Sequence, residues 1–439
     1  MAATTAPPPA PDPAADPQAL LRNPLYVRLV LLAAIIGLPI SALSYGFLKL
    51  VAVLQDAFFT DIPHDLGLNP VPAWWPLPLL ALSGLLVALA IERLPGTGGH
   101  SPADGFHAAG AVPPIELPGV FFAALATLSF GVVLGPEAPL IAMGSGLGVL
   151  AVKLASRDAP QQAVALIAAA GSFAAISSLL GSPLLGAFLL LEAAGLGGPM
   201  LGLVLVPGLL AAGIGALIFL GLDSVTGFGT FTLAIPGLPS FDRLTIAIFL
   251  YAIVFGLVAP FIGRGIQLLA LTIRPHVDPR RLVLMPVLGL AVGALAILFD
   301  QITGDGISMV LFSGQDQLGP LLTQGVDWSV ATVLLLVVCK ALAYGISLSS
   351  FRGGPVFPAM FVGAAAGIAA SHLPGLPLVP AVAMGIGAMS CVMLTLPLTS
   401  VLLATVLLGA NDGVQVMPVV IVAVVVAYIA AARLAPRGA

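Results

Sequence analysis

The stretch GPEAPLIAMGSGLG at residues 135–148 returns at residues 354–367 as GPVFPAMFVGAAAG. The two copies align without a gap, and both follow the pattern G-P-x-x-P-x-x-x-x-G-x-x-x-G. A second pair follows in the same order, with SPLLGAFLLLE at 182–192 and LPLTSVLLATV at 396–406. Because two matches in one order are a poor fit to chance, the chain is predicted to consist of two related halves.

The composition predicts that both halves lie in a membrane. Of the 439 residues, 59% are hydrophobic and only 8% are charged, whereas an average soluble protein carries about 25% charged residues. The apolar runs are long and continuous, unlike the alternating segments of a transmembrane β-barrel. We therefore predict an all-α polytopic membrane protein of two repeated halves, and exclude the soluble globular enzymes.

Composition also argues against nucleic-acid binding, a disulfide framework and a cysteine metal cluster. The formal net charge of −4 shows no basic footprint for nucleic acid. The two cysteines, Cys339 and Cys391, both lie in apolar runs and support neither a disulfide framework nor a metal cluster.

Changes in composition suggest the boundaries of the domains. Residues 1–23 form a Pro/Ala-rich tail that we expect to be disordered. A first membrane repeat is predicted at 24–243 and a second at 244–434, followed by a short tail at 435–439 and no soluble regulatory domain. Arginines near both ends predict, by the positive-inside tendency, that both termini face the cytoplasm after an even number of crossings. The expected location is the plasma (inner) membrane.

The apolar runs differ in length, and proline or glycine interrupts several of them. Long helices are expected at 25–52, 72–93, 200–221, 244–273, 283–300, 328–347 and 415–434. Shorter ones are expected at 118–134, 137–155, 162–180, 183–195, 356–371, 378–394 and 397–410. Broken helices are tolerated within a membrane where they are buried in protein or line a polar cavity.

The repeated Gly-Pro motifs predict an anion site. Proline is favoured in the first turn of a helix, and the first amides of a helix lack intrahelical partners and carry the positive end of its dipole. Two such ends that meet inside the membrane would bind an anion without a full positive charge. The expected binding residues are Gly135, Pro136, Ala138, Gly354, Val356 and Phe357. The alternative is that these motifs are tight packing turns only.

Two acidic residues lie in the apolar runs, where an acid is a functional hypothesis by default. Glu137 follows Gly135-Pro136 at a helix start. Its carboxylate can occupy the anion's place and leave on protonation, which describes a gate and a proton carrier. The alternative is a permanent helix cap. For Glu192, a structural role and a place on a proton path are both open.

A third turn, GTGGHSPADGF at 96–106, precedes the first motif. Gly99 and Ser101 in this turn are candidate anion-binding residues, although a simple surface turn is equally compatible. No ligand spacing for a metal surrounds His100 and His107, so both are interpreted as loop residues. Tyr428 is interpreted as an interfacial or packing residue of the last helix.

At these motifs the chain resembles the CLC family of chloride channels and chloride/proton antiporters. GPEAP at 135–139 is similar to the family's G-K/R-E-G-P motif, with Glu137 in the place of the gating glutamate. GGPVFP at 353–358 resembles G-x-F-x-P, and GGHSP at 98–102 resembles G-S-G-I-P. SPLLGAFLLLE resembles the family's proline-to-glutamate helix, and Lys340 stands where a lysine often precedes the second motif.

The resemblance implies inverted halves of broken and tilted helices, a homodimer with one anion pathway in each subunit, and a gate that opens when Glu137 is protonated. The chain also departs from the family pattern. Pro136 and Ala138 replace the usual basic residue and glycine, and Gly99 stands in the place of the coordinating serine. The residue after Glu192 is Ala193 where proton-coupled members often have a second acid.

These features predict transmembrane transport of chloride or similar small anions, as a voltage-gated chloride channel or a chloride/proton antiporter. The expected partners are small anions, protons, membrane lipid and a second copy of the chain, with no cofactor and no metal. One alternative is a secondary transporter of an organic solute, and another is a fluoride-selective exchanger, which the retained Pro139 weakly disfavours. An intramembrane enzyme is not expected, because the sequence offers no catalytic pair and no HExxH motif.

Overall fold

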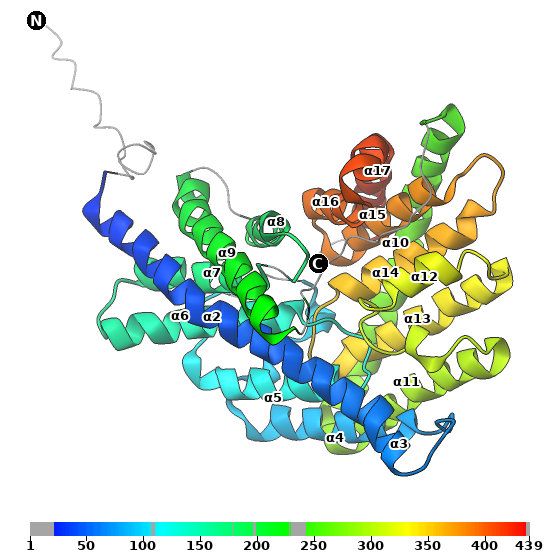
Figure 1. Cartoon of the computed structure of the whole chain (residues 1–439), viewed down its shortest axis with the longest axis horizontal. Helices are drawn as coiled ribbons and strands as arrows, with labels where there is room; N and C mark the ends of the chain where they lie inside the picture. The colour runs from blue at the N-terminus through cyan, green and yellow to red at the C-terminus, as the bar shows by residue number, and fades with distance from the viewer. Residues whose placement is uncertain are drawn as a thin grey trace, which may run out of the picture.

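The computed structural model describes residues 22–106, 110–177, 179–195, 199–227, 229 and 243–435. Most of the expected tail at 1–23, most of that at 435–439, and His107 lie outside the described residues. In the described part of the chain the regular structure is helical, apart from one isolated β-bridge between Gly135 and Gly354 (Figure 1).

The first half contains seven main helices. These are α2 (Pro24–Asp56), α4 (Pro76–Arg93), α5 (Leu117–Leu128), α6 (Glu137–Ala155), α7 (Gln161–Ile176), α8 (Pro183–Ala193) and α9 (Pro199–Thr226). A π-helical turn (Ala57–Asp61) and the short α3 (Ile62–Asp65) extend α2, and the 3-10 turns η3 (Pro95–Gly98), η4 (Pro102–Asp104) and η5 (Pro114–Glu116) connect α4 to α5.

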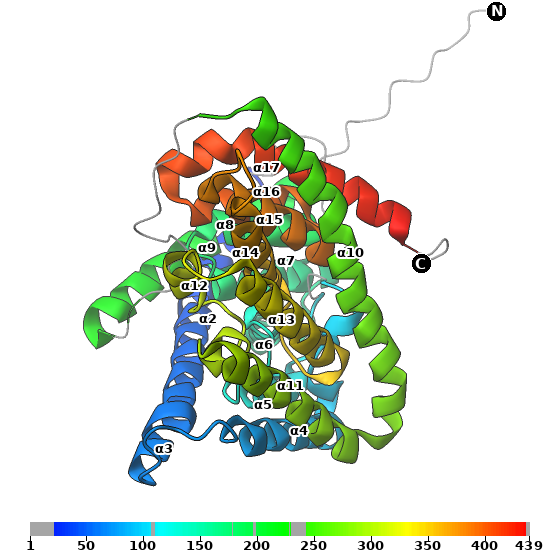
Figure 2. The same cartoon turned by 90° about the vertical axis from the view of Figure 1, so that its right-hand side faces the viewer.

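The described residues of the second half contain eight helices. These are α10 (Ile246–Val277), α11 (Arg281–Thr303), α12 (Leu318–Gln324), α13 (Val330–Ser350), α14 (Val356–Ser371), α15 (Leu378–Leu394), α16 (Pro397–Leu407) and α17 (Gly409–Leu434). The short α12 has no counterpart among the main helices of the first half. The 3-10 turns η6 (Asp278–Arg280) and η7 (Ile307–Met309) lie on either side of α11. In Figure 2 the long α10 runs along one side of the molecule, where it packs against α13 and α17.

The predicted helices are present, and most of their bounds differ from the structure by a few residues; for example, α4 begins at Pro76 instead of residue 72 and α10 ends at Val277 instead of residue 273. The bounds of α6, α14 and α15 are those predicted, whereas α5 ends at Leu128 instead of residue 134. The difference arises because Gly131 adopts a positive φ of 93°, a conformation that ends a helix readily. The short α12 is not among the predicted helices.

Seven helical segments of the described residues are long and apolar enough to span a membrane. One of them, Ile246–Thr303, contains both α10 and α11. Another is α6, which the sequence placed among the short helices and which has 19 residues. A helix needs about 20 residues to cross the hydrocarbon core, so α6 is close to that limit.

The same helix pairs pack together in both halves. The contacts of α6 with α7, of α7 with α9 and of α8 with α9 recur as α14 with α15, α15 with α17 and α16 with α17. Glycine pairs allow the backbones of the first pair in each half to touch, with Gly144 against Gly171 and Gly363 against Gly385. Small residues at helix crossings are the expected device in membrane proteins, since they let the backbones approach closely.

Contacts between the halves are formed by α4 with α11 and by α8 with α16. In Figure 1 the first half, in blue to green, and the second half, in green to red, meet along the middle of the molecule. The N-termini of α6 and α14 meet at this boundary, where the β-bridge of Gly135 and Gly354 joins them.

Candidate functional site

The two Gly-Pro motifs pair with each other through their backbones. The Gly135 amide donates to the Gly354 carbonyl at 2.8 Å, and the Gly354 amide donates to the Gly135 carbonyl at 2.6 Å. Pro136 and Pro355 occupy the N-cap positions of α6 and α14, and neither provides a side-chain cap. The first amides of both helices therefore need partners from elsewhere, because no intrahelical acceptor reaches them.

Glu137 provides such a partner across the boundary between the halves. Its Oε1 accepts a hydrogen bond of 3.0 Å from the Phe357 amide in the first turn of α14. The side chain is 1% exposed, and its Oε2 is buried without a hydrogen-bond partner among the described residues. The acid of the first motif thus lies at the helix end of the second motif, with one oxygen unsatisfied.

The glycines of the two motifs leave room for this carboxyl group. A Cβ atom added to Gly135 or to Gly354 would overlap with the Glu137 carboxylate. Any larger residue at either position would therefore displace the acid. The Gly-Pro motif combines a helix start with space for an occupant at its N-terminus.

Side chains outside the motifs hold the two turns in place. The Tyr344 hydroxyl of α13 is fully buried and donates to the Pro355 carbonyl at 2.9 Å. The Val133 amide, before α6, donates to the Ser347 hydroxyl at 3.2 Å. Tyr344 is not among the site residues predicted from the sequence, although a tyrosine in an apolar run signals a buried hydroxyl that needs a partner.

A cavity of about 190 Å³ lies next to the paired turns. Its walls come from the loop before η4, from the start of α6 and from the segment that leads into α14, and include Gly98, Gly99, His100, Pro102, Ala138, Pro139, Arg352, Gly353 and Pro355. The predicted residues Gly99 and Ala138 are thus brought together here, although they are far apart in sequence.

Ser101 stands in sequence between two residues of this cavity wall, His100 and Pro102, and its Oγ is buried without a partner among the described residues. Arg352 also contributes to the wall and is not among the site residues predicted from the sequence. The available signal was an arginine directly before the second motif, in FRGGPVFP at 351–358.

Glu192 lies elsewhere, at the contact between α8 and α16. It accepts hydrogen bonds from the amides of Leu398 and Thr399 at 2.9 and 2.7 Å, and from the Thr399 hydroxyl at 2.6 Å. The residue at the N-cap of α16, Leu396, provides no side-chain cap. Glu192 therefore caps α16 from the other half of the chain, which corresponds to the structural role left open by the sequence.

Two other singled-out residues lie away from the paired turns. Tyr428 is 44% exposed on α17 and lines a separate cavity with Arg264 and Cys391. Lys340 is fully buried on α13, and its Nζ donates to the carbonyls of Leu311 and Phe312 at 2.8 and 3.0 Å. Neither residue is part of the 190 Å³ cavity wall.

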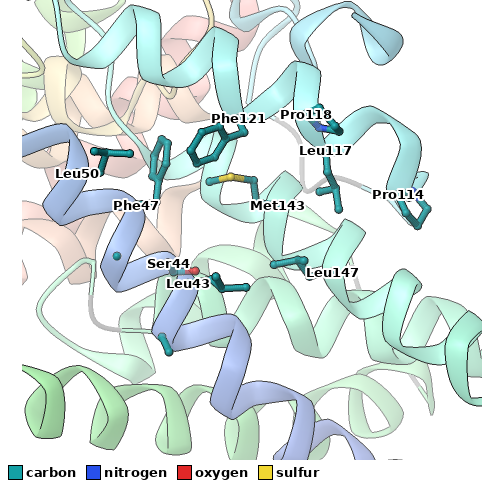
Figure 3. Close-up of a pocket in the computed structure, with 12 residues that line it drawn as sticks. Leu43, Ser44, Phe47, Leu50, Pro114, Leu117, Pro118, Phe121, Met143 and Leu147 are labelled. Atoms are coloured by element: carbon teal, nitrogen blue, oxygen red, sulfur yellow. The ribbon is translucent and has the colours of Figure 1, made fainter. Parts of the chain in front are cut away.

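A larger cavity of about 590 Å³ lies between α2, α5 and α6 (Figure 3). Its lining includes Phe47, Phe121, Met143 and Leu147, and its one polar side chain is Ser44. The Ser44 hydroxyl already donates to the Ile40 carbonyl at 2.9 Å. The lining is therefore almost wholly apolar and offers one side-chain acceptor, the Ser44 oxygen, with which to orient an organic solute. No group of three or more potential metal ligands occurs among the described residues.

The family model that describes the voltage-gated chloride channels matches residues 79–432. Among individual proteins, the chain is 29% identical over 348 residues to YfeO of an Escherichia coli O7:K1 strain, which is named as an ion-transport protein. The match covers 76% of this chain and 77% of that protein. YfeO of Escherichia fergusonii is similar to the same extent.

Solved structures share the fold at low sequence identity. A slow cyanobacterial Cl⁻/H⁺ antiporter superposes with a TM-score of 0.73 at 19% identity, covering 93% of this chain and 95% of that one. A CLC-type fluoride/proton antiporter gives a TM-score of 0.64 at 20% identity, covering 92% and 95%. A eukaryotic CLC transporter gives 0.64 at 16% identity, covering 93% of this chain and 72% of that one.

The family match covers most of the chain, and the solved structures share its arrangement of broken helices. The protein is therefore a multi-pass membrane protein in which the N-termini of α6 and α14 pair with each other. The chain belongs to the voltage-gated chloride channel family, the CLC family of anion transport proteins.

Proposed function

We propose that this protein transports chloride or similar small anions along a pathway that passes the paired N-termini of α6 and α14, and that Glu137 is its gate. The observation that carries the proposal is the position of the Glu137 carboxylate, with Oε1 on the Phe357 amide and Oε2 buried without a partner. A carboxylate that binds a helix N-terminus occupies the place that an anion would take.

Gating then follows from competition for the same amides. When Glu137 is protonated, the carboxyl group loses its charge and binds the helix ends less strongly, since the helix dipole favours an anion. An anion can then replace the carboxyl group, and the side chain that leaves carries a proton. The binding residues proposed for the anion are Gly135, Pro136, Ala138, Gly354, Val356 and Phe357, with Gly99 and Ser101 at the neighbouring cavity.

Proton exchange is part of the proposal, and Glu137 is its proposed carrier. One similar solved structure is described as a Cl⁻/H⁺ antiporter and another as a fluoride/proton antiporter. Glu192 is better suited to the role of a helix cap than to that of a second proton carrier, because three donors already satisfy its two oxygens. The proposal therefore has Glu137 as the acid on which coupling depends.

The assembly and topology that accompany this function are also proposals. We infer a homodimer in the plasma (inner) membrane, with one pathway in each subunit and both termini in the cytoplasm. The helix pairs that recur in the two halves support inverted repeats at 24–243 and 244–434.

The test is simultaneous recording of chloride and pH on proteoliposomes that contain the full chain, with valinomycin to clamp the voltage. We expect the native protein to release chloride and to move protons against it. Glu137→Gln and Glu137→Ala should abolish proton movement and leave chloride flux that no longer depends on pH. The same gradients with fluoride in place of chloride test the fluoride-selective alternative.

Glu192→Gln is the matched control, since it also neutralises one acid of the apolar helices. It should retain the pH dependence of chloride flux. Unchanged pH dependence in both Glu137 variants would contradict the gate, and flux of fluoride without chloride would replace the proposed substrate.

A further inference from the structure

Arg352 is the buried cation nearest to the second motif in sequence, two residues before Gly354. It is 8% exposed, and it lies between Phe351 and Gly353 in the segment that leads from α13 to α14. An ionised side chain removed from water at this depth is costly unless other groups compensate for the lost hydration. The groups around Arg352 therefore indicate how much of its lost hydration is compensated and whether it can bind a further acceptor.

Neutral carbonyl oxygens hold the guanidinium group in place. Its Nε donates to the Thr97 carbonyl at 3.1 Å, and its Nη1 donates to the Ser350 and Phe351 carbonyls at 3.1 Å each. The Arg352 amide donates to the Thr127 hydroxyl at 3.2 Å, which fixes the backbone as well. These bonds orient the guanidinium group but leave its full positive charge.

No carboxylate of the described residues forms a salt bridge with Arg352. The arginines of the described chain that pair with acids are Arg274, with Asp104 and Asp278, and Arg281, with Asp278. Nη2 of Arg352 has no hydrogen bond to the described residues, and it is not among their fully buried unpartnered atoms. The guanidinium group is therefore held in place by carbonyl oxygens, has no carboxylate partner among the described residues, and keeps Nη2 without a hydrogen bond.

Arg352 is part of the wall of the 190 Å³ cavity beside the paired turns, and its Cγ lies close to Gly98 of the same wall. Arg352 lines this cavity together with Gly99, Ala138 and Pro355. Ser101, whose Oγ is buried without a partner among the described residues, stands in sequence between the wall residues His100 and Pro102. The guanidinium edge of Arg352 is a donor without a partner, so this wall favours an acceptor that carries negative charge, and the Ser101 hydroxyl, next to the wall in sequence, is a second unpartnered donor.

The position of this charge complements two features of the sequence. The first motif, GPEAP at 135–139, contains no basic residue, and Gly99 offers no hydroxyl to an anion. Without a basic side chain at the first motif and without a hydroxyl at position 99, an anion that approaches the helix ends finds mainly backbone amides as donors. Because three carbonyls already accept hydrogen bonds from Nε and Nη1, few N–H groups of Arg352 are left for an anion, so it can attract the anion while still permitting its release, which conduction requires.

We propose that Arg352, with the Ser101 hydroxyl, binds the transported small inorganic anion in this cavity before it reaches the helix ends guarded by Glu137. This inference rests on the proposed function and deepens it. It assigns to the second half of the chain a cation that the first motif lacks.

Binding is tested by calorimetric titration of chloride into the purified full-length protein at constant ionic strength. Arg352→Gln should weaken chloride binding by about tenfold, as expected for a lost hydrogen bond to a charged group. Arg433→Gln is the control, since it removes one positive charge from an exposed arginine in the last turn of α17; it should change binding less than about twofold. Equal weakening by both variants would point to general electrostatic attraction and overturn the assigned site.

Flux separates binding from turnover. In proteoliposomes Arg352→Gln should raise the chloride concentration for half-maximal flux and leave the maximal rate within about twofold. Crystals soaked in bromide should show anomalous density beside Arg352 in the native protein and lose it in the variant. A native cavity without bromide would overturn the inference.

Two further variants keep the inference testable if Arg352→Gln does not fold. Arg352→Lys retains the charge without the fork that holds the carbonyls, and should shift half-maximal flux by about threefold or more. Ser101→Ala should weaken binding in the same direction. Native values for both variants would contradict the inference. The proposed gate would be contradicted by a different result, namely chloride flux that is independent of pH both in the native protein and in Glu137→Ala.

Discussion

At the scale of single residues, the site depends on one acid and on two glycines that make room for it. Glu137 reaches from the start of α6 to the Phe357 amide of α14, and a Cβ on Gly135 or Gly354 would overlap its carboxylate. Glycine is therefore required here for space, even though neither residue has a positive φ. The position of the Glu137 carboxylate therefore depends on the absence of a side chain at Gly135 and Gly354.

The first prediction concerns that space. Gly354→Ala should displace the Glu137 carboxylate from the Phe357 amide, because overpacking in a dense interior costs about 1–3 kcal/mol. Chloride flux in proteoliposomes should then lose most of its pH dependence, as in Glu137→Ala. The control is Gly265→Ala on α10, where an added Cβ meets nothing within 4 Å. A native pH response in Gly354→Ala would show that the carboxylate does not need this place.

At the scale of helices, the N-termini of α6 and α14 are distinguished by their pairing with each other across the two halves. Ser182, Ser329 and Thr245 cap α8, α13 and α10 with their own side chains. The ends of α6 and α14 have proline at the N-cap and no side-chain cap, as do those of α7 and α15. At α14, however, the carboxylate of Glu137 binds an amide of the first turn. An N-terminus without its own cap can exchange one anionic partner for another, and this exchange is what a gate requires.

The end of α16 tests the difference between a cap and a proton carrier. Glu192→Ala removes the acceptor of two amides and one hydroxyl, and should lower the free energy of unfolding by about 1–3 kcal/mol. Thermal unfolding in detergent measures this loss, and chloride flux should keep its pH dependence. The exposed Asp327 on the loop before α13 provides a control, since Asp327→Ala should change stability by less than about 0.5 kcal/mol. Native stability with lost proton coupling would assign Glu192 to the proton path.

At the scale of the whole molecule, the two halves form one packed body. The contact of α4 with α11 joins them through glycines, where a Cβ on Gly84 would meet the Met285 carbonyl and one on Gly289 would meet the Leu80 carbonyl. The paired turns of α6 and α14 lie on the same boundary. The geometry of the site therefore depends on how closely the halves approach each other.

A glycine substitution at that boundary should destabilise the whole protein. Gly289→Ala should lower stability by about 1–3 kcal/mol through overpacking, and both halves should unfold in a single transition. Gly213→Ala on α9 has open space around the added Cβ and should be neutral or stabilising, because alanine is the better helix former. Differential scanning fluorimetry at matched protein and detergent concentrations compares the two. Two separate transitions in Gly289→Ala would contradict a jointly packed body.

The sequence by itself determined the class of fold, the repeat and the two motifs. Apolar runs report helices directly, because hydrophobicity and proline or glycine breaks are local properties of the chain, and so the bounds of α6 and α14 were predicted correctly. Glu137 stood out for the same reason, as a charge in an apolar run.

Only the tertiary structure decided which groups meet. The Phe357 amide with Glu137, the Tyr344 hydroxyl with Pro355, and the cap of α16 by Glu192 all join residues of different helices. The place of Arg352 in the cavity wall also depends on three segments that are distant in sequence. Such contacts follow from how the helices cross, and the crossing is set by the close packing of small side chains across the whole body.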